Sequence, residues 1–410
     1  MSQFFNTLKK ISGNEFAFTI EEENPYEVKE WIDTGCYALN AVLSDGDINK
    51  GIPKGKRVMI SGESGVAKSL FVSIIIKAFL DQTKNAKVVF FESEASTVIE
   101  MAKQIGIPDD QILILPVQTV EEFRTQASNI IDKIVEANGK IEAWNAAAKI
   151  ENEKAVKKAK GKKDKPELKK LKDRHEIIMV CDSLGNLGTI AESTIIRTDK
   201  RSKKGGSQTR DMTRAQLIRG MSRTISLKIA MAQIPFLLVN HTYKVMSEYA
   251  EDETSGGGGV KYMSDISLVL TKAKEKDSAK QQIGIMVTLK TRKSRYMKEN
   301  KEVKVLISFS RGMYRFSDLV NKAAELKVFK KDAQSYVLPD GSKAKMKDVR
   351  QHASKYITGD VLEQLRKAIL TDFGFGMEDK KFSFFDDMEE DIDDRSDSEV
   401  EDDIDQELEN

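Results

Sequence analysis

The sequence predicts an α/β fold in which helices flank a mostly parallel sheet. Short apolar segments rich in β-branched and aromatic residues, at 58–61, 88–91 and 177–180, alternate with stretches of helical periodicity. Each segment leads into glycine or carboxylate residues, and open parallel sheets bind ligands at the carboxyl ends of their strands. We expect a short helical segment before this core, and a small helical region and a disordered acidic tail after it.

The first strand runs into the most informative stretch, VMISGESGVAKS at 58–69. Gly62 and Gly65 let the backbone curl so that its N–H groups converge, and the following helix directs its positive end to the same point. This pattern predicts a phosphate-binding loop, with a lysine for the β- and γ-phosphates of a nucleotide and a serine for Mg²⁺. The loop comprises Gly62, Glu63, Ser64, Gly65, Val66, Ala67, Lys68 and Ser69.

One residue departs from the usual pattern of this loop. Ala67 stands where a glycine normally precedes the lysine. Alanine is small, so we expect the loop to survive the change. A chance Gly/Ser turn between a strand and a helix is the alternative interpretation.

Length and composition exclude several classes of protein. With 410 residues, of which 40% are hydrophobic, the chain has the composition of a soluble protein and can form more than one domain. We expect no membrane span and no secretion signal, because no stretch is long and apolar enough. Cys36 and Cys181 are expected to be buried free thiols in a reducing, cytoplasmic setting. The three histidines are too scattered for a zinc cluster.

The formal net charge of +1 hides a strong asymmetry. From Asp386 onward there are 15 acidic residues and one basic residue, so the rest of the chain is basic. A basic body with an acidic tail suggests a polyanionic partner and a tail that competes for the same surface. A tail that serves only solubility is the alternative.

Two carboxylates follow predicted strands. Glu94 comes after the apolar segment 88–91, and Asp182 ends the segment EIIMVCD. Together with the loop upstream, Asp182 is predicted to hold Mg²⁺, directly or through Ser69. Solvated carboxylates at strand ends are the alternative.

These motifs resemble those of RecA-type strand-exchange recombinases. Three further segments add to the resemblance: the Gly-Ile-Pro-Lys-Gly turn at 51–55, Asp-Ser-Leu-Gly-Asn-Leu at 182–187 and GGGGVKYMSDISLVL at 256–270. The resemblance covers roughly residues 32–316 and is strongest to the phage UvsX branch. Five separated motifs in the correct order make it far more specific than any one of them.

The resemblance implies roles for residues around the nucleotide. Glu94 would activate the attacking water, and His241 would sense the γ-phosphate and couple hydrolysis to the DNA loops. Met101 falls where many relatives place an aromatic ring over adenine. Lys293 and Arg295 would reach the ATP of a neighbouring subunit in trans. A core methionine, a structural histidine and a basic strand end are the alternatives.

The resemblance also implies two DNA-binding loops. The first is polar and basic, and the second contains four consecutive glycines, which are costly to order without a ligand. Ordinary exposed loops are the alternative. The residues concerned are Arg197, Lys200, Arg201, Lys203, Lys204, Arg210, Gly256, Gly257, Gly258 and Gly259.

The implied function is that of an ATP- and Mg²⁺-dependent recombinase that forms helical filaments on single-stranded DNA and exchanges strands with double-stranded DNA. The implied partners are further copies of the chain, a single-strand-binding protein and a recombination mediator. Two alternatives are a hexameric helicase-type motor with the same core, and a non-catalytic paralogue that regulates a true recombinase.

One part of the predicted organisation is a charged insertion within the core. Residues 140–174 contain 13 basic and six acidic residues. They are interpreted as an insertion of one or two charged helices, which either contacts the DNA backbone or is simply solvated. The whole chain is predicted to consist of an oligomerisation segment at 1–30, the ATPase core at 31–316, the basic insertion at 140–174 within that core, a small, mostly helical region at 317–385 and the acidic tail at 386–410.

Overall fold

The computed structural model describes most of the chain. It leaves out residues 1–2, 14–16, 20, 23, 25, 95–97, 160–167, 193–207, 244–252, 255–262, 277–279 and 376–410. The chain divides into two compact units, Met1–Gly374 and Phe375–Asn410. Every described helix and strand belongs to the first unit. Among the described residues, no helix is long and apolar enough to cross a membrane.

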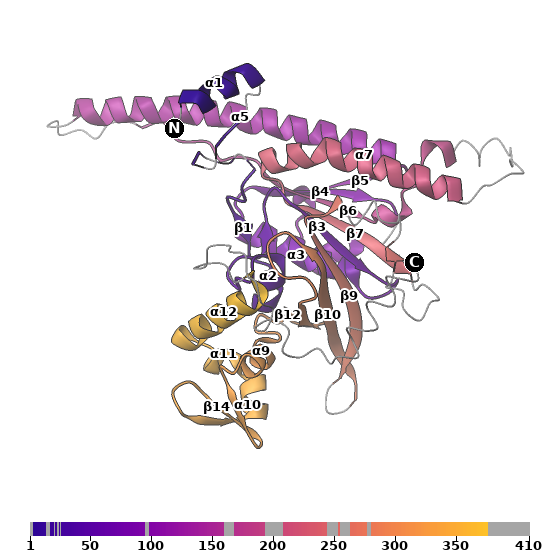
Figure 1. Cartoon of the computed structure of the whole chain (residues 1–410), viewed down its shortest axis with the longest axis vertical. Helices are drawn as coiled ribbons and strands as arrows, with labels where there is room; N and C mark the ends of the chain where they lie inside the picture. Colours follow the sequence, from indigo (N-terminus) through magenta and orange to yellow (C-terminus); the bar gives the residue numbers. More distant parts are fainter. Residues whose placement is uncertain are drawn as a thin grey trace, which may run out of the picture. The chain divides into compact units, whose positions relative to one another are not determined.

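The core is a mixed sheet with the strand order β12-β11-β10-β9-β3-β7-β6-β4-β5 (Figure 1). Its parallel part lies where the sequence predicts it, and β3 is buried along its whole length because helices cover both faces. The predicted fold class is thereby confirmed. The parallel strands are β3 (Arg57–Gly62), β4 (Ala86–Glu92), β5 (Ile112–Pro116), β6 (Glu176–Asp182) and β7 (Phe236–Tyr243).

The other side of the sheet is largely antiparallel. β9 pairs in parallel with β3, and β10 and β11 follow as an antiparallel meander. The strands here are β9 (Ile266–Lys276), β10 (Gln282–Ser294), β11 (Glu302–Ser308) and β12 (Gly312–Met313). Three further two-residue strands are described near the core: β1 (Trp31–Ile32), β2 (Ile52–Pro53) and β8 (Glu253–Thr254).

Alternate side chains of the parallel strands pack into two separate hydrophobic cores, one on each face of the sheet. Val58, Val88 and Ile178 face the layer that contains helix α3 (Lys68–Gln82) and helix α2 (Tyr37–Leu43). Their neighbours Met59 and Val89 face helices α5 (Val120–Ala159) and α7 (Gln208–Ala232). Both cysteines are buried and unpaired, as predicted. The remaining helical pieces before the C-terminal region are α1 (Gln3–Ser12), α4 (Val98–Gln104), η1 (Asp109–Gln111), η2 (Leu184–Asn186) and α7 (Gln208–Ala232).

Helix α5 differs from the prediction. We expect a helix over 120–137 followed by a separate charged insertion, but α5 runs without a break over Val120–Ala159 and packs beside α7 only along its first half (Figure 1). Gly139 does not interrupt it, because one glycine costs a helix only about 1 kcal/mol. The predicted division near Lys140 is therefore wrong for the helix.

An extended segment, 168–175, returns along the second half of α5. Asn138, Asn145 and Asn152 each hold one backbone position of this segment with two hydrogen bonds. Their side-chain amides donate to the carbonyls of His175, Lys172 and Lys169 at 3.1, 2.8 and 2.9 Å. Their side-chain oxygens accept from the N–H groups of the same residues at 2.8, 2.8 and 2.7 Å. We call residues 139–159 and 168–175 the arm.

The C-terminal region contains a small sheet that the sequence does not reveal. Helix α12 is the longest element of this region, and Arg366 on it forms an ion pair with Asp47 at 2.7 Å. A three-stranded antiparallel sheet lies between the helices, which remain the longer elements of the region. Its elements are α9 (Leu319–Glu325), β13 (Lys330–Asp332), β14 (Ser335–Val337), β15 (Lys343–Lys345), α10 (Met346–Gln351), α11 (Ala353–Tyr356) and α12 (Gly359–Phe373).

A buried ion pair fixes β9 against β3. The Arg57 guanidinium donates to both carboxylate oxygens of Asp265, at 3.0 and 3.1 Å, and both side chains are buried. We predict that Asp265→Ala lowers the free energy of unfolding by about 3–5 kcal/mol, because it leaves a buried guanidinium without its carboxylate. Asp81→Ala, which removes an exposed partner of Lys77, is the control and should cost less than about 1 kcal/mol. Urea denaturation measures both, and equal losses would contradict the prediction.

Candidate functional site

The carboxyl ends of four parallel strands meet at one edge of the sheet. Gly62 at the end of β3 pairs with His241 of β7, and Glu92 at the end of β4 pairs with Asp182 of β6. Because β6 and β7 are neighbours, the phosphate-binding loop, both predicted carboxylates and the histidine gather there. The motifs predict this grouping, because each of them follows a strand of the parallel sheet.

The backbone of residues 62–69 has the shape that the glycine-rich pattern requires. A Cβ atom on Gly62 would lie 2.8 Å from the Leu270 carbonyl oxygen, so only glycine fits. Gly65 and Ala67 have φ angles of +78° and +68°. Ala67 therefore adopts the left-handed conformation of the glycine it replaces, and it does so at the N-cap of α3. Glu63, Ser64 and Gly65 are exposed, and Val66 is half-buried.

Lys68 is buried at the start of α3. Its Nζ donates to the carbonyls of Gly62 and Glu63 at 3.0 and 2.9 Å, so the ammonium folds back over the loop. Burial lowers the pKa of Lys68, and the charges of Asp182 and Glu94 oppose that shift. The ammonium thus lies at the centre of the loop, where it can meet an anion.

Ser69 and Asp182 form the pair expected of a magnesium site. The Ser69 hydroxyl donates to Asp182 Oδ2 at 2.6 Å. Burial raises the pKa of Asp182 to about 6, although the bond from Ser69 acts in the opposite direction. A hydroxyl and a carboxylate side by side are the oxygen ligands that Mg²⁺ takes next to a phosphate. The donor set therefore fits this metal.

Glu94, His241 and Lys68 form a chain of contacts. His241 Nε2 lies 2.7 Å from Glu94 Oε1, and His241 Nδ1 lies 3.3 Å from Lys68 Nζ. Lysine can only donate, so Nδ1 accepts and the Nε2–H group donates to the carboxylate. Burial alone would raise the pKa of Glu94, but hydrogen bonding by Ser183 and His241 and the charge of Lys68 bring it below its usual value.

Two further side chains lie near the loop, and the sequence points to only one of them. Met101 on α4 is half-buried, and its sulfur lies 3.5 Å from the Ser73 hydroxyl on α3, so it packs against the helix that follows the loop. Lys272 on β9 donates to the carbonyl of Gly65, a contact that the motifs do not predict. The only signal for it is its place two residues after Leu270, which pairs with Gly62.

Lys293 and Arg295 lie away from the phosphate-binding loop of their own chain. Ser294, between them, pairs with Ile266 beside the start of β3, about 13 Å along the strand from Gly62. The Lys293 ammonium donates to the Ser264 carbonyl at 2.8 Å, and Arg295 is 60% exposed with its Nε 3.4 Å from Asp265. Neither side chain serves this chain's own loop, and a role in a neighbouring subunit stays a prediction.

The predicted DNA-binding residues fall mostly outside the described part of the chain. Arg210 is on α7, but its side chain is not among those described. The others, outside the described residues, are Arg197, Lys200, Arg201, Lys203, Lys204, Gly256, Gly257, Gly258 and Gly259. Their assignment remains a prediction.

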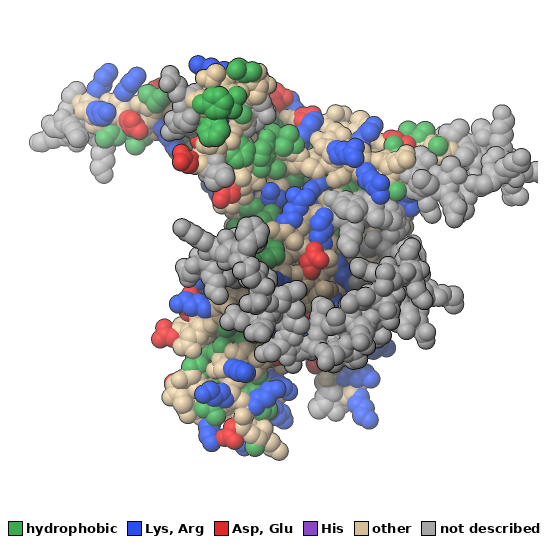
Figure 2. Space-filling model, in the orientation of Figure 1, with side chains coloured by type: hydrophobic (Ala, Val, Ile, Leu, Met, Phe, Trp, Pro, Cys, Tyr) green, Lys and Arg blue, Asp and Glu red, His purple; other side chains and the backbone are tan. Residues whose placement is uncertain are grey.

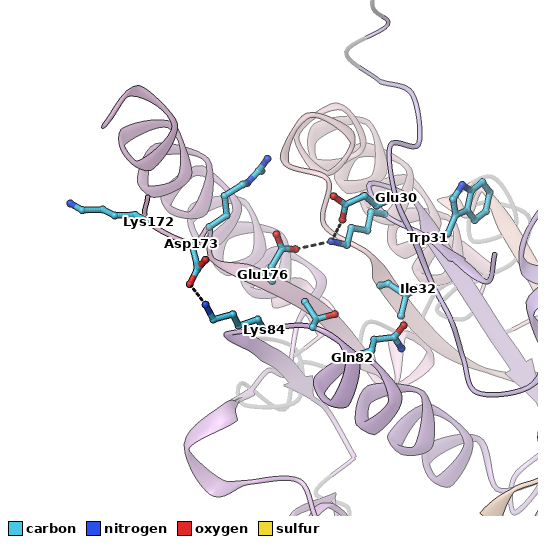
Figure 3. Close-up of a pocket in the computed structure, with 11 residues that line it drawn as sticks. Glu30, Trp31, Ile32, Gln82, Lys84, Lys172, Asp173 and Glu176 are labelled. Carbon is cyan, nitrogen blue, oxygen red and sulfur yellow. Dashed lines mark hydrogen bonds and ion pairs between the residues drawn. The ribbon is translucent and has the colours of Figure 1, made fainter. Parts of the chain in front are cut away.

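A cavity of about 530 Å³ lies near the amino ends of the strands, on the opposite edge from the loop (Figure 3). Its charged side chains already have partners: Lys54 contacts Glu30 and Glu176, and Lys84 contacts Asp173. In a parallel sheet this edge does not present phosphate-binding N–H groups. The cavity therefore lacks the features expected of a nucleotide site.

The fold and the loop define an α/β protein with a predicted phosphate-binding loop, and comparisons with known proteins show which proteins of this kind it is similar to. The chain is 24% identical to the recombination and repair protein of Enterobacteria phage T4, over 80% of this chain and 71% of that protein. It is 24% identical to the RecA protein of a Wolbachia strain from Brugia malayi (77% and 74%) and 22% identical to that of Petrotoga mobilis (82% and 78%). No family model matches the chain.

These similarities confirm the resemblance inferred from the motifs. The chain is a distant relative of the RecA-family recombinases, and its core is RecA-like.

The conformation of Ala67 gives a prediction about loop stability. Ala67→Gly relieves a left-handed alanine and should leave the free energy of unfolding unchanged or raise it by up to about 1 kcal/mol. Ala78→Gly, inside α3 with ordinary helical geometry, should lower it by about 1 kcal/mol. Thermal and urea unfolding of both variants measure the difference. A similar loss in both would show that the loop does not strain Ala67.

The raised pKa of Asp182 predicts a pH dependence without metal or nucleotide. The folded carboxyl, with a pKa of about 6 against 3.8 ordinarily, binds more protons than the unfolded one between about pH 4 and 6. Asp182 therefore reduces stability as the pH rises through that range. We expect Asp182→Asn to be more stable than wild type by up to about 3 kcal/mol at pH 7, and equal to it near pH 4. A difference that stays constant with pH in urea titrations would contradict this.

Proposed function

We propose that this protein is an ATP-dependent DNA recombinase that forms helical filaments on single-stranded DNA and promotes homologous pairing and strand exchange. The observation that carries the proposal is the meeting of Lys68, the Ser69–Asp182 pair and the Glu94–His241 contact at one sheet edge. These are the parts that phosphoryl transfer to water requires. The similarity to RecA proteins and to a phage recombination protein supports the choice of reaction.

Each residue has a defined task in this proposal. The N–H groups of residues 62–69 and the Lys68 ammonium bind the phosphates of ATP, and Ser69 and Asp182 hold Mg²⁺. Bound Mg²⁺ would neutralise phosphate charge. Glu94, which its lowered pKa keeps ionised at neutral pH, orients water and accepts its proton.

His241 gives the site a means of reporting its state. It contacts both Lys68 and Glu94, so a change at either end alters its hydrogen bonds. It also lies on β7, which ends at Tyr243, directly before residues 244–252 and the predicted glycine-rich DNA loop. We propose that this placement couples hydrolysis to DNA release.

Two features support assembly into filaments. Helix α1 carries an apolar face of Phe4, Phe5, Leu8 and Ile11, whose exposed fractions range from 43% to 76%. A lone chain leaves this face largely open to water, whereas a second copy could cover it. Lys293 and Arg295 are placed away from their own loop, as residues that serve a neighbour's nucleotide must be.

The test is ATP hydrolysis with and without single-stranded DNA, followed by electron microscopy of the same samples. We expect DNA-stimulated turnover in the wild type and at least a 100-fold loss in Glu94→Gln, because the variant lacks the base. Glu325→Gln, a matched change at the exposed last residue of α9, should retain turnover. Helical filaments support the proposal. Closed rings would indicate a helicase-type motor, and absence of turnover in the wild type would indicate a regulatory paralogue.

A further inference from the structure

The arm carries a concentration of positive charge that the site does not use. Its described residues include nine basic and four acidic side chains. Figure 2 shows basic side chains along the end of α5 that lies farthest from α7. A surface of this kind attracts polyanions.

Several acidic side chains of the arm form ion pairs with basic residues of the arm or next to it. Glu142 binds Arg174 at 3.0 Å, and Asp173 binds Lys84 at 2.8 Å, while the Lys172 ammonium lies over the Trp144 ring at 4.6 Å. Lys169 likewise binds Glu151 at 2.5 Å. These contacts, together with the three asparagines, tie the returning segment to α5 and hold the arm in one shape.

Three lysines near the end of α5 are left for an external ligand. Lys154, Lys157 and Lys158 are exposed, and they have no acidic partner among the described residues. Their spacing of three and four residues puts them on one face of the helix, opposite the face that Asn152 presents to the returning segment. Lys157 and Lys158 lie in the last turn of α5, where positive charge stabilises the C-terminus of a helix. This stabilisation does not explain Lys154, which lies before the last turn.

We propose that this lysine face of the arm binds the phosphate backbone of duplex DNA. The inference rests on the proposed function, because it supplies a second DNA contact outside the predicted loops. The chemistry is backbone recognition: lysines act as point charges toward phosphates, and no aromatic side chain on the described lysine face could stack on an unpaired base.

A lipid surface fits this face less well. Membrane-binding helices join basic residues to a continuous apolar face that contains aromatic anchors. The exposed apolar residues of the arm, such as Ile150, Val156 and Leu171, are about half-exposed, and the Lys172 ammonium lies over the Trp144 ring. Ile150 and Val156 are six residues apart on α5, which puts them on different faces of the helix. Duplex DNA is therefore the favoured ligand.

The experiment compares two triple variants of the full-length protein. The arm variant is Lys154→Gln, Lys157→Gln and Lys158→Gln, which keeps helix propensity. The control is Lys87→Gln, Lys133→Gln and Lys343→Gln, which removes the same charge from exposed lysines outside the arm that already have acidic partners. Fluorescence anisotropy of a labelled 30-base-pair duplex and of the matching single strand, from 50 to 300 mM salt, gives affinities and salt slopes.

We expect the arm variant to bind duplex about 10-fold more weakly at 0.1 M salt, with a salt slope smaller by about 2 to 3, and the control to resemble the wild type. Equal effects in both variants would overturn the inference, as would an equal loss for duplex and single strand. Arm-dependent binding to anionic phosphatidylserine vesicles with unchanged duplex binding would assign the face to lipid instead.

DNA-stimulated ATP hydrolysis, measured on the same variants, tests the proposed function separately, since the arm variant should retain this hydrolysis on single-stranded DNA.

Discussion

The parallel register of β3, β4, β6 and β7 is the constraint on which the site depends. Pairing of Gly62 with His241 and of Glu92 with Asp182 brings residues from four distant parts of the chain to one edge. A slip of one residue in any strand would turn its side chains to the other face. The two cores on either side of the sheet prevent such a slip, because alternate residues of each strand are committed to different helices.

That constraint concentrates charge where burial opposes it. Burial disfavours the charged forms of both Lys68 and Asp182. The chain offsets this through short contacts: carbonyls surround Lys68, Ser69 donates to Asp182, and His241 connects Lys68 to Glu94. Such an arrangement reduces stability locally, but it places fixed charges in a medium of low dielectric, where they act more strongly on phosphate than they would in water.

The parallel strands, the loop and the main carboxylates could be predicted from the sequence because short apolar segments and glycine spacing are local signals. Lys272 could not, because its contact with Gly65 depends on how β9 pairs with β3. The small sheet at 330–345 has strands of three residues, too short to show alternation. The full length of α5 is missed because the charged stretch after residue 139 is interpreted as the end of the helix. Glu and Lys are good helix formers, so a charged composition alone does not end a helix.

The asparagines of the arm show how a polar segment can be rigid without a core. They recur every seven residues, which is about 10.5 Å along a helix and returns to nearly the same face. Their partners recur every three residues of extended chain, about 9–10 Å, so each amide meets a backbone N–H and carbonyl in turn. Because the first half of α5 packs on the sheet beside α7, the core that sets the register of the site also fixes the direction in which the arm presents its lysines.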